Sequence, residues 1–596
     1  MSRVPLRPLA RILSARQKGE DHKAIENENK HQRMLAARGR QRQMAEGRLL
    51  IASICFAAAF IAVGAKMFIL STTEAAEPRI ASTDAKIYPQ RANIVDRNGR
   101  ILATNLSTYS LYAQPQMMTD PETSAVELAE IFPEIDAQKL LADFTGGRKF
   151  LWIKKKISPE QKQLVHDIGD PGLLFGPREM RLYPNGKLAA HVLGGAGFGR
   201  EDVHSAEVIG VAGVEKTFDE FLRDPAQQGA PLELSIDMTV QDASAQVLQG
   251  GMKIMNAIGA SSVLMNVKTG EIVSMVSLPD FDPNLRPPPT PAADPTLNPL
   301  FNRALQGVYE LGSVFKTFTI AQALDSGLKT KDSVVDTRSP FVIGKYKIKD
   351  FRNYGTELSV EKILVKSSNI GTARIATEIG AERQREFFKS LGLLDVAPVE
   401  MVEAHGGRPQ FPKKFSEIST VTMAYGHGIA TSPVQVAAAY SSILNGGLRV
   451  TPTILKTPSV QPGPRVVSEE TALTMRKLLR KVVLEGTASF GEVAGYDVGG
   501  KTGTADKPDP KGGYYDDKVI ATFASVFPAS DPQYVLIVTL DEPSETSSGE
   551  PRRTAGWTAV PVAAEMIRRI APLLGIRPVI EPGPGFGIIQ AKSSSQ

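Results

Sequence analysis

Apolar and polar residues follow different patterns in successive parts of the chain, and the longest apolar run comes first. Residues 49–70 read LLIASICFAAAFIAVGAKMFIL and are interrupted only by Lys66. A helix of this length, at about 1.5 Å per residue, matches a hydrocarbon core of about 30 Å. The pattern predicts a single membrane-spanning helix, with a buried core helix and a cleaved signal peptide as alternatives. A signal peptide is disfavoured because 48 residues precede the run and no Ala-x-Ala site stands out before Glu74.

Short apolar and polar stretches alternate between residues 71 and 231. Asp96-Arg-Asn-Gly99 separates two apolar runs, 92–95 and 100–103, which is typical of a β-hairpin. No nucleophile stands beside a base in this segment. We therefore expect an elongated, non-catalytic α+β domain over 71–231.

The pattern between residues 232 and 577 predicts one large α/β domain. Helices are expected at 240–258 and 557–574, and strands at 232–236, 261–266, 272–276, 498–503, 521–527 and 534–540. A loop with eight prolines, 279–299, is expected to lack regular structure. Residues 578–596 are rich in Pro, Gly and Ser and are expected to be disordered.

Composition and charge then narrow the class of protein. The chain has 596 residues, of which 42% are hydrophobic, so it is long enough for two to four domains. Its one cysteine, Cys55, excludes an intrachain disulfide and a cysteine metal cluster. No H-E-x-x-H motif is present, so neither a metal nor another cofactor is expected.

Positive charge is concentrated before the apolar run. Residues 1–48 hold twelve Lys or Arg and five acids, a net +7 against +5 for the whole chain. Residues 71–86 hold two basic residues and three acids. This bias predicts that 1–48 is a cytoplasmic tail and that the chain after 71 lies on the other, outer side of the membrane. The alternative for the tail is a solvated, disordered arm.

The candidate nucleophile lies near the middle of the chain. In Tyr309-Glu-Leu-Gly-Ser313-Val-Phe-Lys316, a Gly precedes a Ser that leads into an apolar-periodic run. This pattern predicts a tight turn that places Ser313 at a helix N-terminus, with Lys316 one turn along the same face as its base. A Ser and a Lys three apart occur roughly twice by chance in such a chain, and Ser359 with Lys362 is another instance.

Two further motifs follow in a fixed order and make a chance occurrence of the Ser313–Lys316 pair improbable. Ser367-Ser368-Asn369 comes about fifty residues later, and Lys501-Thr502-Gly503-Thr504 comes after it. A second Lys-Thr-Gly at 268–270 lies between two apolar strands and is interpreted as a hairpin turn.

The chemistry suits each of these residues. Lys316 can take the proton of Ser313 only if burial or positive neighbours lower its pKa. Ser367 and Asn369 would supply a proton relay and amide hydrogen bonds to a peptide-like substrate. Lys501 and Thr502 would bind its terminal carboxylate, and Gly503 would let its backbone approach. The N–H groups of Ser313 and Thr504 would form an oxyanion hole.

This ordered set resembles that of the serine β-lactamases and penicillin-binding proteins. Over most of residues 45–575 the chain is similar to the class B penicillin-binding proteins, and among them to the FtsI-type, division-specific D,D-transpeptidases. The motifs that carry this resemblance are Arg91–Ala103, Arg181-Leu-Tyr-Pro, His191-Val-Leu-Gly, Gly210–Lys216, Tyr425–Gln435, Gly486-Thr-Ala and Gly500–Ala505. One departure is Leu311, where the family often has Pro.

The resemblance implies a multidomain α/β (α+β) architecture: a transmembrane helix, a pedestal (dimerisation-type) domain and a β-lactamase-like transpeptidase domain. It implies that Ser313 attacks the bond between the two terminal D-alanines of a peptidoglycan stem peptide and is acylated by β-lactams. The implied setting is the bacterial inner membrane, with the catalytic domain in the periplasm and an FtsW-type glycosyltransferase and other divisome proteins as partners. No nucleic-acid partner is expected.

Three alternatives remain open at this point. The first is an elongation-specific class B transpeptidase, which performs the same chemistry in a different complex. The second is a membrane-bound β-lactamase or β-lactam sensor, and the third is a non-catalytic divisome scaffold. A 160-residue pedestal argues against the second, and the complete set of catalytic side chains argues against the third.

Overall fold

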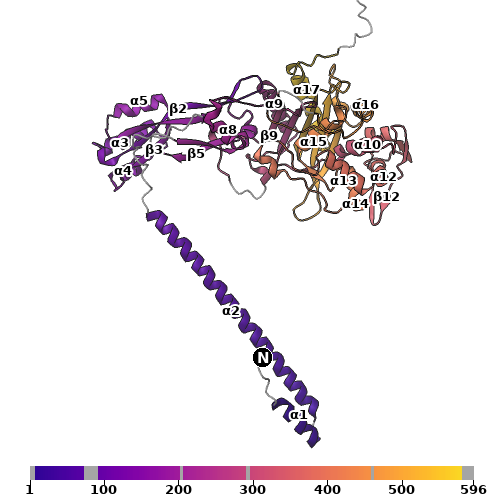
Figure 1. The fold of residues 1–596 in the computed structure, drawn as a ribbon, viewed down its shortest axis with the longest axis horizontal. Coiled ribbons are helices and arrows are strands. Elements are labelled where there is room, and N and C mark those ends of the chain that lie inside the picture. Colours follow the sequence, from indigo (N-terminus) through magenta and orange to yellow (C-terminus); the bar gives the residue numbers. More distant parts are fainter. Residues whose placement is uncertain are drawn as a thin grey trace, which may run out of the picture. The chain divides into compact units, whose positions relative to one another are not determined.

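A computed structural model describes residues 7–19, 21–72, 91–201, 206–289, 295–457 and 462–579. The chain divides into two compact units, Met1–Arg79 and Ile80–Gln596 (Figure 1). The predicted disordered tail 578–596 falls almost entirely outside the described residues.

The first unit is helical. It contains α1 (Arg7–Lys18) and α2 (His22–Thr72), a helix of 51 residues. The alternative that the basic N-terminal segment is a disordered arm disagrees with these two helices. The apolar side chains described between residues 51 and 67 of α2, such as Phe56 and Phe60, are exposed.

A membrane span is not found in the described part of the chain, where no helix is both long and apolar enough to cross a bilayer. The side chains of residues 49–50 and 68–70, at the two ends of the predicted span, lie outside the described residues. The span at 49–70 therefore stays a prediction.

The second unit begins with the pedestal domain, built around a five-stranded sheet. Strand β2 (Ile101–Ala113) pairs antiparallel with β3 (Leu151–Ile157), β4 (Leu173–Leu182) and β1 (Ile94–Val95), and β1 pairs in parallel with β7 (Leu232–Glu233). The expected hairpin at 96–99 is confirmed, since β1 and β2 flank it and Gly99 has φ +79°. The remaining pedestal elements are η1 (Pro115–Met117), α3 (Pro121–Ile131), α4 (Ala137–Thr145), α5 (Pro159–Ile168), α6 (Ala190–Leu193), β5 (Gly195–Glu201), β6 (Ala206–Ala212), α7 (Gly213–Thr217), α8 (Asp219–Arg223) and η2 (Pro225–Gln227).

A buried ionic cluster ties the pedestal motifs together. The carboxylate of Glu215 on α7 accepts from Arg91 Nε (2.7 Å) and Arg181 Nε (2.6 Å), and Asp219 accepts from Arg91 Nη1 (2.7 Å). Tyr183 donates to the same carboxylate at 3.3 Å. Buried charges are stable only when they are paired and hydrogen-bonded, so this cluster explains why charged residues occupy an otherwise apolar part of the pedestal.

The transpeptidase domain is organised by an antiparallel sheet with the strand order β16-β17-β18-β8-β9. These strands are β16 (Gly499–Pro508), β17 (Tyr514–Phe527), β18 (Tyr534–Asp541), β8 (Gly259–Asn266) and β9 (Ile272–Leu278). Five of the six predicted strands correspond to them, and the sixth is the two-residue β7 of the pedestal sheet. The turn between β8 and β9 is the Lys268-Thr-Gly270 hairpin that the sequence predicted, with Gly270 at φ +75°.

Helices cover the sheet on both sides and bury its apolar residues. Helices α9 (Met238–Ile254) and α17 (Ala559–Leu573) pack on each other and on the sheet, and α15 (Pro433–Leu444) packs on β8 and β18 (Figure 1). Central residues such as Val263, Phe523 and Ile537 have no exposed surface. The predicted helices 240–258 and 557–574 are thus confirmed as α9 and α17, although each is shorter than predicted.

A helical subdomain lies beside the sheet and carries the first two motifs. Its helices and strands are η5 (Gly312–Phe315), α10 (Lys316–Asp325), β11 (Val334–Asp336), β12 (Phe341–Ile343), β13 (Tyr346–Ile348), β14 (Glu357–Ser359), α11 (Val360–Lys366), α12 (Asn369–Ile379), α13 (Ala381–Ser390) and α14 (Glu417–Ala424). The other elements of the domain are η3 (Pro283–Leu285), η4 (Pro295–Leu297), β10 (Tyr309–Glu310), η6 (Val402–Gly406), β15 (Ala430–Thr431), α16 (Glu469–Glu485) and η7 (Ser489–Gly491). The proline-rich loop thus contains two short 3-10 turns among its described residues.

Candidate active site

Ser313 lies in a tight turn that opens into helix α10. Gly312 has φ +55°, and a Cβ at this position would lie 2.7 Å from the carbonyl oxygen of Thr504. Leu311, where the family often has Pro, is fully buried. The turn is therefore fixed by close backbone packing, and it places Ser313 against the strand that carries the third motif.

Lys316 is the first residue of α10 and is fully buried. Its Nζ donates to the carbonyl oxygen of Ser367 (2.6 Å), to Asn369 Oδ1 (2.7 Å) and to Ser367 Oγ (3.1 Å). Among the described residues, the Ser313 hydroxyl has no hydrogen bond to Lys316. Catalytic hydrogen bonds often form only when substrate is bound, so a missing Ser313–Lys316 bond in the free protein is compatible with the predicted proton transfer.

Lys501, on the sheet, also contacts Ser367. It lies on β16, is fully buried, and its Nζ donates to Ser367 Oγ (3.0 Å) and to the carbonyl oxygen of Thr502 (3.1 Å). The hydroxyl of Ser367 therefore lies between the two lysines. Ser367 has φ +63° and ends helix α11, a left-handed conformation that is uncommon for a residue other than glycine.

Burial lowers the pKa of both amines, and repulsion by Lys501 adds to the effect at Lys316. Burial lowers the pKa of Lys316 well below 10.5, the positive charge of Lys501 lowers it further, and the carboxylate of Asp350 opposes the shift. Burial lowers the pKa of Lys501 to about 7. A neutral amine at Lys316 near neutral pH is the condition under which it can accept the proton of a serine hydroxyl.

Asp350 is a site residue that sequence reasoning missed. Its carboxylate accepts from the Ser368 hydroxyl (2.8 Å) and from the backbone N–H groups of Asn369 and Ile370. These contacts cap helix α12 and hold Asn369 in place beside Lys316. The sequence gives no signal for it, because Asp350 stands about twenty residues earlier in the chain, in a loop after β13.

The third motif lines the other wall of the site. Thr502 Oγ1 lies 2.6 Å from Thr487 Oγ1, and Thr504 Oγ1 accepts from the backbone N–H of Ala555 (2.9 Å). Thr487 belongs to the Gly486-Thr-Ala stretch, to which the sequence analysis gave no role. β16 is an edge strand, and no strand among the described residues pairs with its outer edge.

Gly503 has a packing role that the sequence did not predict. A Cβ at this position would lie 2.0 Å from the carbonyl oxygen of Leu311 and 2.7 Å from a methyl group of Val314. Only glycine lets β16 lie so close to the Ser313 turn. The predicted approach of a substrate backbone at Gly503 stays a prediction.

A cavity of about 720 Å³ joins the three motifs. Ser313, Ser367 and Asn369 line it together with Thr502 and Thr504. Lys316 and Lys501 lie beneath its floor, with no exposed surface. All five predicted catalytic residues thus line one cavity or belong to the hydrogen-bonded group around Ser367.

Aromatic side chains at the rim of this cavity were also missed by the sequence analysis. Phe490 and Trp557 lie with ring centroids 5.0 Å apart, and Arg552 lies over the Trp557 ring at 4.1 Å. Phe351 is 80% exposed and lines the cavity as well. Such rings give a peptide ligand apolar surface at little entropic cost.

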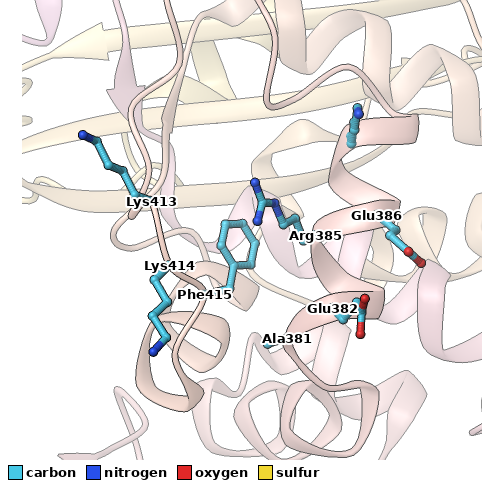
Figure 2. Close-up of a pocket in the computed structure, with 8 residues that line it drawn as sticks. Ala381, Glu382, Arg385, Glu386, Lys413, Lys414 and Phe415 are labelled. Atoms are coloured by element: carbon cyan, nitrogen blue, oxygen red, sulfur yellow. The ribbon is translucent and has the colours of Figure 1, made fainter.

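A second cavity of about 550 Å³ shares no residue with this one. It lies between α13 and residues 413–415, and Arg385 points toward Phe415, with its guanidinium 5.6 Å from the ring centroid (Figure 2). No residue predicted from the motifs lines it. Among the described residues, no group of three His, Cys, Asp or Glu is placed to hold a metal ion.

The other Ser-x-x-Lys pair has a structural role. The Ser359 side chain accepts from the backbone N–H of Lys362 and caps helix α11. The Lys362 ammonium instead pairs with Glu485 at 2.7 Å. The chance match that the sequence contains is therefore a helix cap, and the arrangement of three motifs is found only at Ser313 within the described residues.

The structure brings together a buried lysine near Ser313, a second lysine on a sheet strand and a hydroxyl hydrogen-bonded to both, which is the arrangement expected of a serine acyl-transfer site. The family model "Penicillin binding protein transpeptidase domain" matches residues 260–566, and the model "Penicillin-binding Protein dimerisation domain" matches residues 86–228. The chain belongs to the penicillin-binding proteins that combine a dimerisation domain with a transpeptidase domain.

Individual relatives narrow the position of the chain within the penicillin-binding proteins. The chain is 37% identical over 499 residues to the probable peptidoglycan D,D-transpeptidase FtsI of Caulobacter vibrioides, with 82% of each chain covered. It is 28% identical to the FtsI of Escherichia coli, covering 77% of this chain and 80% of that protein. The solved structure of penicillin-binding protein 3 from Mycobacterium tuberculosis with aztreonam has a TM-score of 0.61 and 25% identity, covering 83% of this chain and 98% of that one. The chain is thus a serine-type class B enzyme of the FtsI kind, as its sequence predicted.

Proposed function

We propose that the protein cross-links peptidoglycan stem peptides during septal wall synthesis through an acyl-enzyme at Ser313. Ser313 Oγ attacks the carbonyl carbon between the two terminal D-alanines, and its proton passes to Lys316. The N–H groups of Ser313 and Thr504 stabilise the oxyanion. Lys316 passes this proton to the leaving nitrogen as the C–N bond breaks. The last D-alanine leaves with a free amino group, and an ester remains on Ser313.

The second half of the reaction uses the same groups in reverse. The amine of a neighbouring strand attacks the ester carbonyl and loses a proton to the Lys316 and Ser367 network, and Ser313 leaves as an alcohol. In the first half of the reaction, before the last D-alanine leaves, Asn369 clamps the donor peptide and Lys501 with Thr502 binds its terminal carboxylate. The outer edge of β16 offers backbone groups to an extended peptide, in the manner of an added strand.

The observation that carries this proposal is the position of the Ser367 hydroxyl between Lys316 and Lys501, at 3.1 and 3.0 Å. A hydroxyl placed there can pass a proton between the buried amine and the cavity. A β-lactam would acylate Ser313 by the same attack, since its ring contains an amide bond and its carboxylate would bind at Lys501 and Thr502.

Labelling with a fluorescent penicillin tests the assignment. The intact protein is expected to form a stable covalent adduct, and Ser313→Ala is expected to lose it with an unchanged melting temperature. Ser359→Ala is the matched control and is expected to keep the label, because Ser359 only caps α11. Labelling of Ser313→Ala at the parent rate would refute the site, and rapid decay of the parent label would favour the β-lactamase alternative.

We further propose that residues 49–70 anchor the protein in the bacterial inner membrane, with 1–48 in the cytoplasm and the catalytic domain in the periplasm. The support is the apolar sequence of this segment and the basic segment before it. An FtsW-type glycosyltransferase and other divisome proteins are the partners we expect, by resemblance alone. A fluorescent fusion should gather at midcell, whereas a side-wall pattern would favour the elongation-specific alternative.

A further inference from the structure

The hairpin that precedes the second motif carries an unusual amount of positive charge. We call residues 341–354 the cationic arm: they contain β12, β13 and the segment that leads to the cavity. Its apolar residues Ile343 and Ile348 are buried in a cluster with Ile370 of α12 and Val421 of α14. The arm is therefore anchored on the helices that hold the site, and its outer residues are held in defined positions.

The charges of the arm are segregated. Lys345, Lys347, Lys349 and Arg352 are exposed, while its one acid, Asp350, is turned inward to cap α12. None of these four cations forms an ion pair with a carboxylate in the part of the chain that the structure describes. The outer face of the arm is thus uniformly positive.

Two cations continue this positive face into the active-site cavity. Arg352 of the arm and Lys366 at the end of α11 both line it, together with Ser313. The Arg352 guanidinium lies 6.0 Å from the Phe351 ring centroid, and the Lys366 ammonium lies 5.8 Å from that of Tyr354. The rings hold the two cations while leaving their N–H donors for a ligand.

The negative charge of the same cavity is already neutralised. Glu485 also lines it, but its carboxylate pairs with Lys362 at 2.7 Å. Arg352 and Lys366 have no carboxylate partner among the described residues. A cavity wall with two cations and no free anion attracts a negatively charged ligand and orients it with its anionic group toward that wall.

We propose that Arg352 and Lys366 form a second carboxylate subsite, which recognises a free carboxylate on the donor peptide upstream of its terminal residue. The inference rests on the proposed function, in which Lys501 and Thr502 take the terminal carboxylate. The planar guanidinium of Arg352 suits bidentate binding of a carboxylate, and Lys366 adds a second charge. The enzyme therefore selects an anionic peptide over its amidated counterpart.

Direct binding tests this subsite without requiring turnover. Two fluorescent peptides ending in D-Ala-D-Ala, one with a free carboxylate and one with a primary amide at the same upstream residue, are titrated against the full chain carrying Ser313→Ala. The free acid is expected to bind about tenfold more tightly, and the preference should shrink as salt increases. Arg352→Gln and Lys366→Gln should each weaken binding of the acid about fivefold and leave binding of the amide unchanged.

Two lysines of the separate cavity in Figure 2 provide a matched control. Lys413→Gln with Lys414→Gln removes the same two charges at a site that shares no residue with the active-site cavity. This double variant should keep the full preference for the acid. Equal binding of acid and amide by the parent, or an unchanged preference in the Arg352 and Lys366 variants, overturns the subsite.

Failure of the subsite and failure of the proposed function give different results. If Ser313 is labelled by penicillin but the peptide preference is absent, only the subsite is wrong. If the preference is present but Ser313 is not labelled, the cationic arm still recognises carboxylates and the acyl-enzyme is wrong. A loss of folding in either Gln variant would be seen as a lowered melting temperature, and Lys366→Met with Arg352→Met then repeats the comparison.

Discussion

At the scale of single residues, the site depends on two lysines that are held in places where a charged amine is unfavourable. Lys316 and Lys501 have no exposed surface, and both donate to Ser367. Burying an ammonium costs free energy, so the protein gives up stability to obtain amines that are reactive near neutral pH. Their protonation should therefore be visible in the rate of acylation.

The pH dependence of acylation follows from Lys501. Its pKa is lowered to about 7, so its positive charge is present below pH 7 and is lost above it. Because this charge attracts the substrate carboxylate, the second-order rate constant for acylation by a fluorescent penicillin should fall between pH 7 and 9. The melting temperature, measured at each pH, shows whether folding is unchanged. A rate that stays constant up to pH 9 would contradict this role of Lys501.

Asp350 provides a second test at this scale. Asp350→Ala removes the acceptor of the first two N–H groups of α12, while the Ser368 cap stays, and should lower the free energy of unfolding by about 1 to 2 kcal/mol. Because Asn369 loses a contact that holds it beside Lys316, acylation should slow about tenfold or more. Asp332→Ala is the control, since Asp332 is exposed and pairs with its neighbour Lys331. Parent-like acylation by Asp350→Ala would show that the cap does not position the site.

At the scale of elements, the site is made by the contact of one turn with one strand. The turn η5 carries Ser313, and β16 carries Lys501 and Thr502. Gly312 and Gly503 lie at their contact, where a Cβ at either position would overlap backbone atoms of the other element. These two glycines thus let the nucleophile and the carboxylate site lie close together.

Gly503→Ala should separate these two elements. The added Cβ would lie 2.0 Å from the Leu311 carbonyl oxygen, so β16 or the turn must shift. We expect a loss of roughly 1 to 3 kcal/mol in the free energy of unfolding and a loss of acylation larger than 100-fold. Gly250→Ala on α9 meets nothing within 4 Å and should be neutral or stabilising. Normal acylation by Gly503→Ala would mean that the contact tolerates a methyl group.

The sequence predicted those parts of the site that are carried by short local patterns. Ser313 and Lys316 are three residues apart on one turn, and Lys501-Thr-Gly lies on one strand, so periodicity and spacing were sufficient. Asp350, Thr487 and the Phe490–Trp557 pair act through contacts between segments far apart in the chain, which no local pattern encodes. The same holds for Gly503, whose reason is the Leu311 carbonyl oxygen almost two hundred residues earlier.

At the scale of the whole molecule, the sheets were predicted more reliably than the pedestal core. β8, β9 and β18 are apolar runs and match their predicted positions closely, whereas β17 begins at Tyr514, seven residues before its predicted start, in a polar stretch. The pedestal instead depends on the cluster of Arg91, Arg181 and Glu215, whose members come from three separate motifs. The motifs were recognised by resemblance, but only the structure shows that they meet.

Removing the central anion of this cluster tests its importance. Glu215→Gln leaves the buried Arg181 without its carboxylate and takes from the buried Arg91 one of its two carboxylate partners, the other being Asp219. It should lower the free energy of unfolding of the pedestal by about 3 to 5 kcal/mol. Urea unfolding followed by Trp152 fluorescence in a Trp557→Phe background reports on the pedestal alone, because the chain has two tryptophans. Glu220→Gln, at an exposed position on α8, is the control. An unchanged urea midpoint for Glu215→Gln would show that the cluster adds no stability.

The open edge of β16 has a consequence for handling the protein. Strand edges with unpaired N–H and C=O groups bind other strands without regard to their origin, including the same edge of another molecule. A surface shaped to receive a peptide is for this reason also a place where concentrated enzyme can self-associate. Occupying that edge with a covalently bound inhibitor should keep the purified protein dispersed, and light scattering at high concentration would reveal the difference.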